Sequence, residues 1–291
     1  MSKEISQQQA RVNHYKLMEK VLKSCIFFFL LLISFIVLYP MVYTVSAAFT
    51  PGNSISSLSI IPFGNGITLD HFTYLFNNTD YLTWFKNTLI IATATSVSTV
   101  IVCGLSAYVF SRFRFQFKKS LMMALLILQI FPSFIGMVSI YVILLRIGGL
   151  DTLWGMVLIY LAGNIPYNTW LVKSYIDTIP KSLDEAAKID GASNARIFFQ
   201  IVLPQAKPIL VFLGITSFTG PWMEFIFSKM ILRSAKHQTL ALGLFSFVTD
   251  KKNDFTLFCA GALLVAIPFI IFFTMTQKML VTSLGSAGVK E

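Results

Sequence analysis

Charged side chains are scarce in this sequence. Asp, Glu, Lys and Arg make up 12% of its 291 residues, about half the share of an ordinary soluble domain. Hydrophobic residues make up 55%, and 28 residues are phenylalanine. Composition therefore places the chain in the membrane class. Acidic residues are the rarer kind, 13 against 23 basic ones. The basic residues lie between apolar runs and not in a patch with base-stacking aromatics, so the excess positive charge does not predict nucleic-acid binding.

Patterns that carry chemistry are also missing from the sequence. The three cysteines, Cys25, Cys103 and Cys259, lie in apolar segments without metal-ligand spacing, so neither a disulfide nor a metal site is predicted. No G-x-x-x-x-G-K-[ST] phosphate loop occurs in the chain. No nucleophile is paired with a base in the pattern that catalysis requires. We expect a non-catalytic chain that binds no cofactor.

Long apolar runs are the feature that is present. A helix that crosses a bilayer needs about 20 mostly apolar residues, and six segments qualify. The polar stretch before the first segment, and the length of that segment, favour a retained helix over a cleaved signal peptide. We therefore expect an all-α integral membrane protein with spans near 24–48, 88–110, 120–145, 153–175, 208–230 and 257–280.

Lys and Arg predict the orientation of these spans. Sixteen of the 23 basic residues fall in the N-terminal tail, in the second-to-third and fourth-to-fifth loops, and near the C-terminus. By the positive-inside rule these regions are cytoplasmic, and so are both termini. The fifth-to-sixth loop disagrees, because it carries five basic residues and must lie outside. The resulting division is a tail at 1–23, a membrane domain at 24–283 with an external loop at 49–87 and a cytoplasmic loop at 177–207, and a tail at 284–291.

The loop between the fourth and fifth spans predicts a short helix. Pro180 ends the incoming helix, and Ser182 with Glu185 three residues later has the spacing of a capping box. Gly191 can end the helix, because glycine accepts the left-handed cap conformation. The expected helix covers Leu183 to Asp190. Ala186 and Ala187 would offer a thin face that fits a groove on a partner. Leu183 and Ile189 would be apolar anchors. Glu185 and Asp190 would supply charges that orient the helix.

The spacing in this loop resembles a known family signature. Glu-Ala-Ala, then three residues, Gly, nine residues and Ile-x-Leu-Pro resembles the signature loop of the membrane subunits of ABC-type importers. The matching residues are Glu185, Ala186, Ala187, Gly191, Ile201, Leu203 and Pro204. The resemblance implies a coupling helix that docks on a separate ATP-hydrolysing subunit. ATP and Mg²⁺ would then be bound by two such partner subunits.

Weaker markers resemble the carbohydrate branch of that family, most of all the shorter, MalG-type subunit of maltose and maltodextrin importers. They include Tyr39-Pro40, Asn87-Thr88 and the Thr239–Leu244 segment. The resemblance implies the bacterial cytoplasmic membrane, a longer MalF-type sister subunit that makes most sugar contacts, and an external sugar-binding protein. It also implies a tail contact to the ATPases through Gly288, Val289 and Lys290. Raffinose-type sugars or multiple sugars are the alternative substrates.

Polar residues inside the expected spans are candidates for a substrate path or gate. Glu224 is an ionisable group in the fifth span, and such groups often serve function. Gly220 and Pro221 can break the helix before it, and Trp222 could stack on a sugar ring. Alternatively, Glu224 lies at headgroup level or pairs with Lys229 or Arg233.

Two amides in the middle spans leave the same choice open. Gln129 and Asn164 could line the path, or could form interhelical hydrogen bonds without any substrate. A transporter that works without an ATPase is the competing functional hypothesis, but neither an inverted repeat nor a charge relay is seen in the sequence.

Overall fold

Every regular element that the structure describes is helical. The computed structural model of the protein describes residues 2–130, 135–249 and 254–287, and no strand occurs among them. The all-α prediction is thus confirmed for these residues. In chain order the helices are α1 (Ser2–Phe49), α2 (Asp70–Asn78), α3 (Tyr81–Arg112), α4 (Lys118–Ile130), α5 (Met137–Ile147), α6 (Leu153–Asp177), α7 (Lys181–Ile189), α8 (Asn194–Ile197), a π-helical turn (Phe198–Val202), α9 (Leu203–Met223), α10 (Ile226–Ile231), α11 (Leu240–Thr249) and α12 (Phe255–Ala287), with short 3₁₀ turns at Ile55–Ser57 and Ala235–His237.

Four helical stretches in the described part are long and apolar enough to cross a membrane. They are Met18–Phe49, Tyr81–Arg112, Asn194–Met223 and Phe255–Thr274, and they correspond to the first, second, fifth and sixth expected spans. The expected third span is divided between α4 and α5, which lie on either side of residues 131–134; the structure does not describe these four residues. The expected fourth span is α6, which has 25 residues and includes Asn164, Asn168 and Thr169 but is not among the four stretches named above.

Two expected boundaries were wrong. The second span was expected from Thr88, but α3 begins at Tyr81, because its first two turns pack into the core through Tyr81 and Trp84. The fifth span was expected to start at Pro208, but α9 begins at Leu203. Helix α9 follows directly on the π-helical turn Phe198–Val202, which joins α8 and α9 into one helical stretch.

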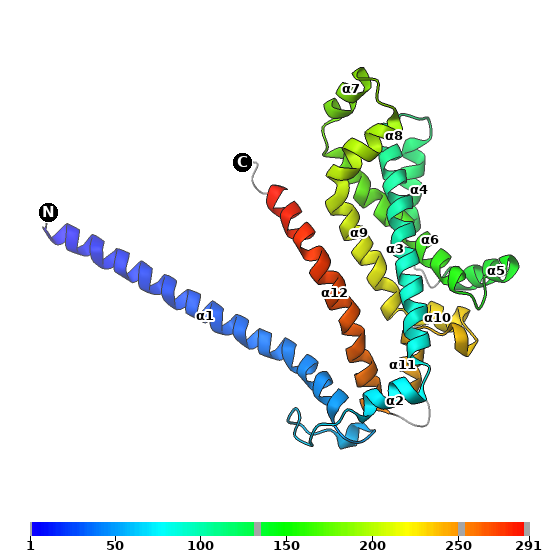
Figure 1. Ribbon diagram of the computed structural model, residues 1–291. Helices are drawn as coiled ribbons and strands as arrows, with labels where there is room; N and C mark the ends of the chain where they lie inside the picture. The colour runs from blue at the N-terminus through cyan, green and yellow to red at the C-terminus, as the bar shows by residue number, and fades with distance from the viewer. Residues whose placement is uncertain (1, 131–134, 250–253, 288–291) are drawn as a thin grey trace.

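The centre of the molecule is α3, which lies against α6 and α9 (Figure 1). Small and hydroxyl side chains allow these helices to approach closely, as is common in membranes. Ser96 Oγ donates a hydrogen bond to the carbonyl oxygen of Gly214 on α9 at 2.8 Å. Thr95 and Thr99 on the same helix are completely buried. These three helices together form the central body of the molecule.

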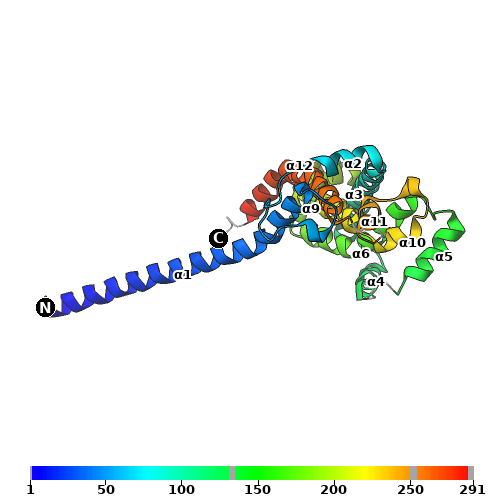
Figure 2. The same cartoon turned by 90° about the horizontal axis from the view of Figure 1, so that it is seen from below.

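Helix α1 lies largely outside this body. Figures 1 and 2 show it joined to the rest at its C-terminal end and projecting away from the bundle in both views. Its described side chains are exposed almost as far as Ser46, including Phe28 and Phe35 at 67% and 68%. Its last turns contact α12, where Ala47 and Ala48 are buried. The apolar side chains before these turns are exposed in the part of the chain that the structure describes, so they require lipid or another subunit around them.

The end of the molecule that carries α2, which we call the α2 end, is fixed by long-range hydrogen bonds. Asn87 Nδ2 donates to the carbonyl oxygens of Lys236 and Gln238, both at 2.9 Å. The Leu240 amide donates to Thr88 Oγ1 at 2.8 Å. Helix α2, Asp70–Asn78, lies at this end, with His71 and Leu75 buried.

Asp151 anchors the segment after α10. Its Oδ1 accepts hydrogen bonds from the amides of Arg233 and Ser234 at 2.9 and 3.0 Å, and His237 Nδ1 lies 3.4 Å from it. Burial would raise the pKa of this carboxyl, but the bonds from Ser234, Arg233 and His237 outweigh it and hold the pKa well below its usual range. The pKa of Asp151 is lower in the folded protein than in the unfolded chain, where it is about 3.9. The ionised carboxylate therefore stabilises the fold at every pH above about 3.9. This stabilisation is lost only as pH falls through the folded pKa.

We therefore expect the two amide hydrogen bonds to Asp151 to be unchanged between pH 8 and pH 5. Asp151 has a φ of 54°, so Asp151→Gly removes the acceptor without backbone strain. Hydrogen exchange of the Arg233 and Ser234 amides, corrected for intrinsic pH dependence, should become about tenfold faster in this variant. Asp151→Asn keeps an acceptor oxygen and tolerates the left-handed conformation, so it is the matched control. Equal exchange in both variants would contradict the role of Asp151.

Candidate functional site

Helix α7 lies at the extreme end of the molecule opposite α2 (Figure 1), here called the α7 end. Its C-terminus is as the sequence predicted: Gly191 has a φ of +81°, its amide donates to the Lys188 carbonyl at 3.0 Å, and the Ala192 amide donates to the Ala187 carbonyl at 2.9 Å. These two bonds form a Schellman motif, which needs a left-handed residue after the helix.

The predicted start of α7 was wrong. The helix begins at Lys181 with Pro180 as N-cap, and no side chain caps it. Ser182 is therefore already the second helical residue, where its hydroxyl cannot take the capping position. No capping box forms, because the extended backbone of Pro180 turns the chain into the helix one step earlier.

The two faces of α7 differ sharply. Ile189 is 87% exposed and Leu183 41% exposed, and Glu185, Ala186 and Asp190 are also exposed. Ala187 was expected to share the open face with Ala186. It is half-buried and packs against a core cluster that includes Tyr108 and Ile197. The face available to a partner is thus formed by Leu183, Glu185, Ala186, Ile189 and Asp190.

A buried ion pair holds the opposite face of α7. Arg112, the last residue of α3, places its Nε 2.6 Å from Oδ2 of Asp184, and their side chains are only 6% and 9% exposed. Arg112 Nη2 also donates to the Ile179 carbonyl at 3.0 Å. A cavity of about 220 Å³ borders the pair and is lined by basic groups, among them Arg114 and Lys188. The sequence did not single out Asp184, because its neighbour Glu185 carries the signature.

The end of α6 is fixed to the same point. Ser111 Oγ donates to Asp177 Oδ1 at 2.6 Å and Lys173 Nζ donates to Asp177 Oδ2 at 2.5 Å. Burial acts to raise the pKa of Asp177, but the bonds from Lys173 and Ser111 outweigh it and lower the pKa. Burial, followed by repulsion from Lys173, lowers the pKa of Lys118 at the start of α4.

The segment after α7 returns to the bundle. Ser193 caps α8 by accepting from the Arg196 amide at 3.3 Å. Tyr108 of α3 donates to the Asn194 carbonyl at 3.2 Å, and its ring lies 4.9 Å from that of Phe198. Leu203 packs against the same cluster, whereas Pro204 is exposed in the first turn of α9. α3 therefore contacts the chain on both sides of α7.

The predicted gate residues lie apart from α7. Helix α9 continues through Gly220 and Pro221 to Met223, so the expected break at Gly220-Pro221 was wrong and falls three residues later. Trp222 is 3% exposed and its ring packs on Phe85, Phe218 and Phe269. In this arrangement the indole is part of the core and has no free face for a sugar ring.

Glu224 caps and anchors α10. Its Oε1 accepts from the Phe227 amide at 2.7 Å, and its Oε2 accepts from the Ser228 amide and hydroxyl at 3.0 and 3.1 Å. Tyr160 of α6 donates to Oε2 at 3.0 Å. Neither Lys229 nor Arg233 pairs with it among the ion pairs of the described residues. The alternative pairing with those cations was therefore wrong.

The middle-span amides make no common site. Asn164 Nδ2 donates to Thr99 Oγ1 on α3 at 3.4 Å, which is the interhelical bond of the alternative interpretation. Gln129 is exposed near the end of α4. Gly288, Val289 and Lys290 lie outside the described residues.

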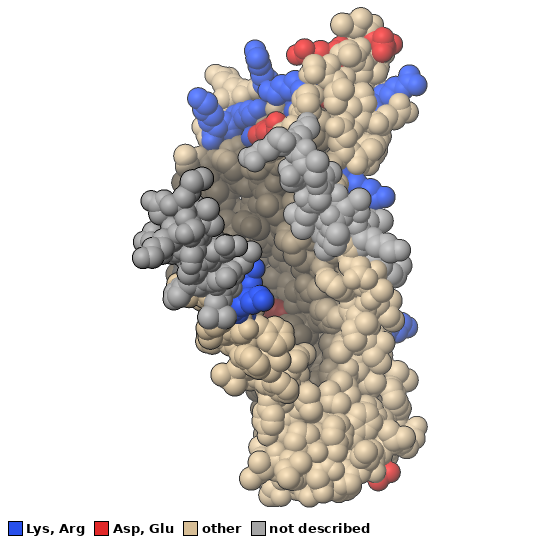
Figure 3. All heavy atoms as spheres, turned by 90° about the vertical axis from the view of Figure 1, so that its left-hand side faces the viewer, with Lys and Arg blue, Asp and Glu red and all other residues tan. Residues whose placement is uncertain are grey.

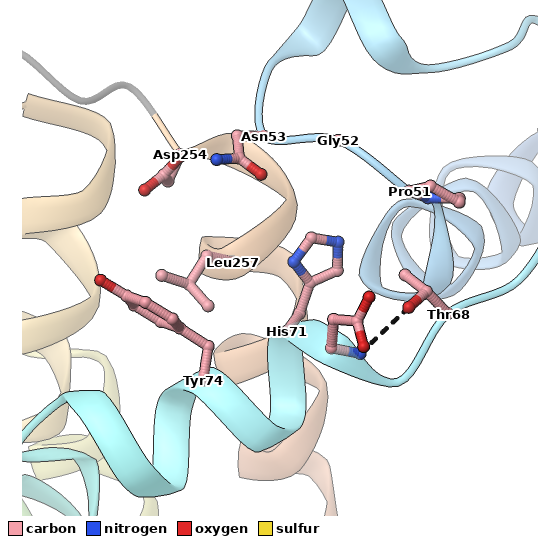
Figure 4. Close-up of a pocket in the computed structure, with 9 residues that line it drawn as sticks. Pro51, Gly52, Asn53, Thr68, His71, Tyr74, Asp254 and Leu257 are labelled. Carbon is pink, nitrogen blue, oxygen red and sulfur yellow. Dashed lines mark hydrogen bonds between the residues drawn. The ribbon is translucent and has the colours of Figure 1, made fainter.

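A cavity of about 490 Å³ lies at the α2 end. Figure 4 shows His71 and Tyr74 of α2 on one side, with Asn53 and Asp254 across the opening. His71 Nε2 is 2.8 Å from the Thr50 carbonyl oxygen, so this ring is fixed by the chain itself. No motif in the sequence pointed to this cavity. In the searched part of the chain no three His, Cys, Asp or Glu residues are placed to hold a metal ion.

Comparison with known proteins gives the family. Residues 99–284 match the family described as binding-protein-dependent transport system inner membrane component. The chain belongs to this family. The permease is 41% identical over 269 residues to the maltodextrin transport system permease protein MdxG of Bacillus subtilis (strain 168), with 92% of this chain and 96% of the relative covered. It is 42% identical over 259 residues to GanQ, the galactooligosaccharides permease of the same organism, covering 88% and 91%.

A solved structure shows that the fold is shared as well. The permease superposes with a TM-score of 0.74 and 21% identity on a chain of a bacterial ABC transporter involved in the import of the acidic polysaccharide alginate, covering 86% of this chain and 93% of that one. The family resemblance seen in the signature loop is confirmed, and the chain is a multi-pass membrane permease.

Proposed function

We propose that this permease is the non-catalytic membrane subunit of an ATP-driven oligosaccharide importer in the bacterial cytoplasmic membrane, with maltodextrin as the substrate. The observation that carries the proposal is α7: a short helix at the end of the molecule, fixed by one face and exposed by the other. The relatives named above transport maltodextrin and galactooligosaccharides, which supports a sugar. Galactooligosaccharide is the second candidate, since that relative is equally similar.

We propose six spans with both termini in the cytoplasm, α4 with α5 forming the third and α6 the fourth. Charge supports this orientation: on the face shown in Figure 3, Lys and Arg gather at the α7 end. Because basic residues favour the cytoplasm, the α7 end would be inside and the α2 end outside. The membrane domain is 24–283, between tails at 1–23 and 284–291, with external and cytoplasmic loops at 49–87 and 177–207.

The exposed face of α7 would dock in a groove on an ATP-hydrolysing subunit. ATP and Mg²⁺ would be bound there, and closure of two such subunits around ATP would displace α7. The external α2 end would receive sugar from a binding protein, which the family description also requires. The apolar length of α1 would lie against a longer sister subunit of the MalF type. The C-terminal residues Gly288, Val289 and Lys290 would reach toward the ATPases.

The test is Ile189→Asp in the assembled complex. A docked isoleucine of this size contributes about 1.5–3 kcal/mol through burial, so we expect co-purification of the ATPase subunit, and maltodextrin uptake, to fall about tenfold or more. Ile60→Asp is the matched control, because Ile60 is 85% exposed at the α2 end. It should leave ATPase co-purification unchanged.

Two outcomes would contradict the proposal. One is unchanged ATPase binding in Ile189→Asp. The other is sugar accumulation by the purified chain alone in vesicles, without ATP, which would favour a transporter that works without an ATPase.

A further inference from the structure

Three successive parts of the chain around α7 are held by two neighbouring residues of α3. Ser111 bonds Asp177 at the end of α6, at 2.6 Å. Arg112 Nη2 donates a hydrogen bond to the Ile179 carbonyl in the connecting segment at 3.0 Å, and its Nε forms an ion pair with the Asp184 carboxylate within α7 at 2.6 Å. The connection from α6 to α7 therefore makes three contacts with the C-terminal end of α3.

The chain changes direction at a residue on each side of α7, so contacts to α3 are needed to hold the orientation of the helix. Pro180 precedes it and the left-handed Gly191 follows it. Each is a place where the backbone changes direction. Without a side-chain contact to the bundle, a force on the exposed face could rotate α7 about these two residues and leave the membrane helices where they are.

The Arg112–Asp184 pair has the properties of a stiff contact. Both side chains are at most 9% exposed, so water screens their attraction little. Among the described residues neither Asp184 Oδ1 nor Arg112 Nε has a hydrogen-bond partner, so the contact is an ion pair and the carboxylate depends on the charge of Arg112. Loss of either partner would leave an uncompensated buried charge. Glu185, one position along, is exposed and free to face a partner subunit, whereas Asp184 faces inward.

We propose that the Arg112–Asp184 pair is the positioning contact that transmits displacement of α7 to α3. This inference rests on the proposed function of α7. Since α3 packs along α6 and α9, a push on α7 moves the three central helices together. The signature loop then acts through a residue that lies outside the Glu-Ala-Ala pattern, and the receiving element is the second expected span.

The test uses the whole complex in vesicles, with sister subunit, ATPases and binding protein. Asp184→Asn has the same shape but lacks the charge. We expect the ATPases to remain bound while the number of ATP molecules hydrolysed per maltodextrin imported rises at least threefold. The exchanged double variant, Arg112→Asp with Asp184→Arg, should recover part of the ratio. Lys23→Gln breaks an ion pair whose side chains are 72% and 61% exposed and should leave the ratio unchanged.

An unchanged ratio in Asp184→Asn, with normal amounts of complex, would overturn the inference. So would loss of ATPase binding together with a normal ratio in the remaining complexes, because the pair would then only shape the docking face. If Asp184→Asn does not accumulate, Asp184→Glu keeps the charge but alters the geometry, and the same criterion applies to it. Failure of the proposed function is recognised separately, by normal ATPase binding in Ile189→Asp.

Discussion

Gly191→Val should abolish most sugar uptake while leaving the membrane bundle folded. Gly191 has a φ of +81° and a side-chain carbon there would meet no atom within 4 Å, so the effect is conformational and not steric. The left-handed region costs an L residue about 1–2 kcal/mol, and a β-branched residue more. The Schellman bonds of Gly191 and Ala192 would open, and α7 would lose its defined end. We expect maltodextrin uptake to fall about tenfold.

Gly191→Asn is the matched control for this prediction. Asparagine tolerates the left-handed conformation far better than valine, so uptake should stay above about half of the unsubstituted value. The amount of permease in the membrane is measured for each variant, to separate coupling from accumulation. Normal uptake in Gly191→Val would contradict the role of the Schellman motif. An equal loss in both variants would show that any side chain at this position blocks docking.

Glu224→Ala should destabilise the permease by breaking the link between α10 and α6. It removes the acceptor of two backbone amides and two hydroxyls, those of Phe227, Ser228 and Tyr160. A hydrogen bond to a charged group contributes about 1.5–3 kcal/mol, and the freed amides of α10 are partly compensated by water. We expect a loss of about 2–3 kcal/mol, seen as a fall of about 5 °C or more in the thermal unfolding of the purified complex.

Tyr160→Phe is the control for Glu224, since it removes only the contact between α6 and α10. It should lower the midpoint by about a third as much. If Glu224 instead touched sugar, Glu224→Ala would leave the unfolding midpoint unchanged and alter which oligosaccharides are transported. The two results separate an anchoring carboxylate from a substrate-binding one.

The sequence was a good guide where one residue type dictates local geometry. Gly191 ended α7 because few other residues accept its backbone conformation. It was a poor guide where geometry depends on packing. Trp222 and Glu224 are candidate gate residues because both are unusual in a span. Only the tertiary structure shows that the indole packs in an aromatic core and that the carboxylate anchors α10.

The sequence by itself determined the class of protein, the position of the signature loop and the end of its helix, because hydrophobic length and backbone conformation are local properties. Only the tertiary structure decided which face of α7 is open and what holds the other. Asp184 and Arg112 are 72 positions apart in the chain, and their pairing follows from α3 packing beside α6. A buried ion pair of that kind leaves no periodic trace in a sequence, because it depends on where two helices end in space.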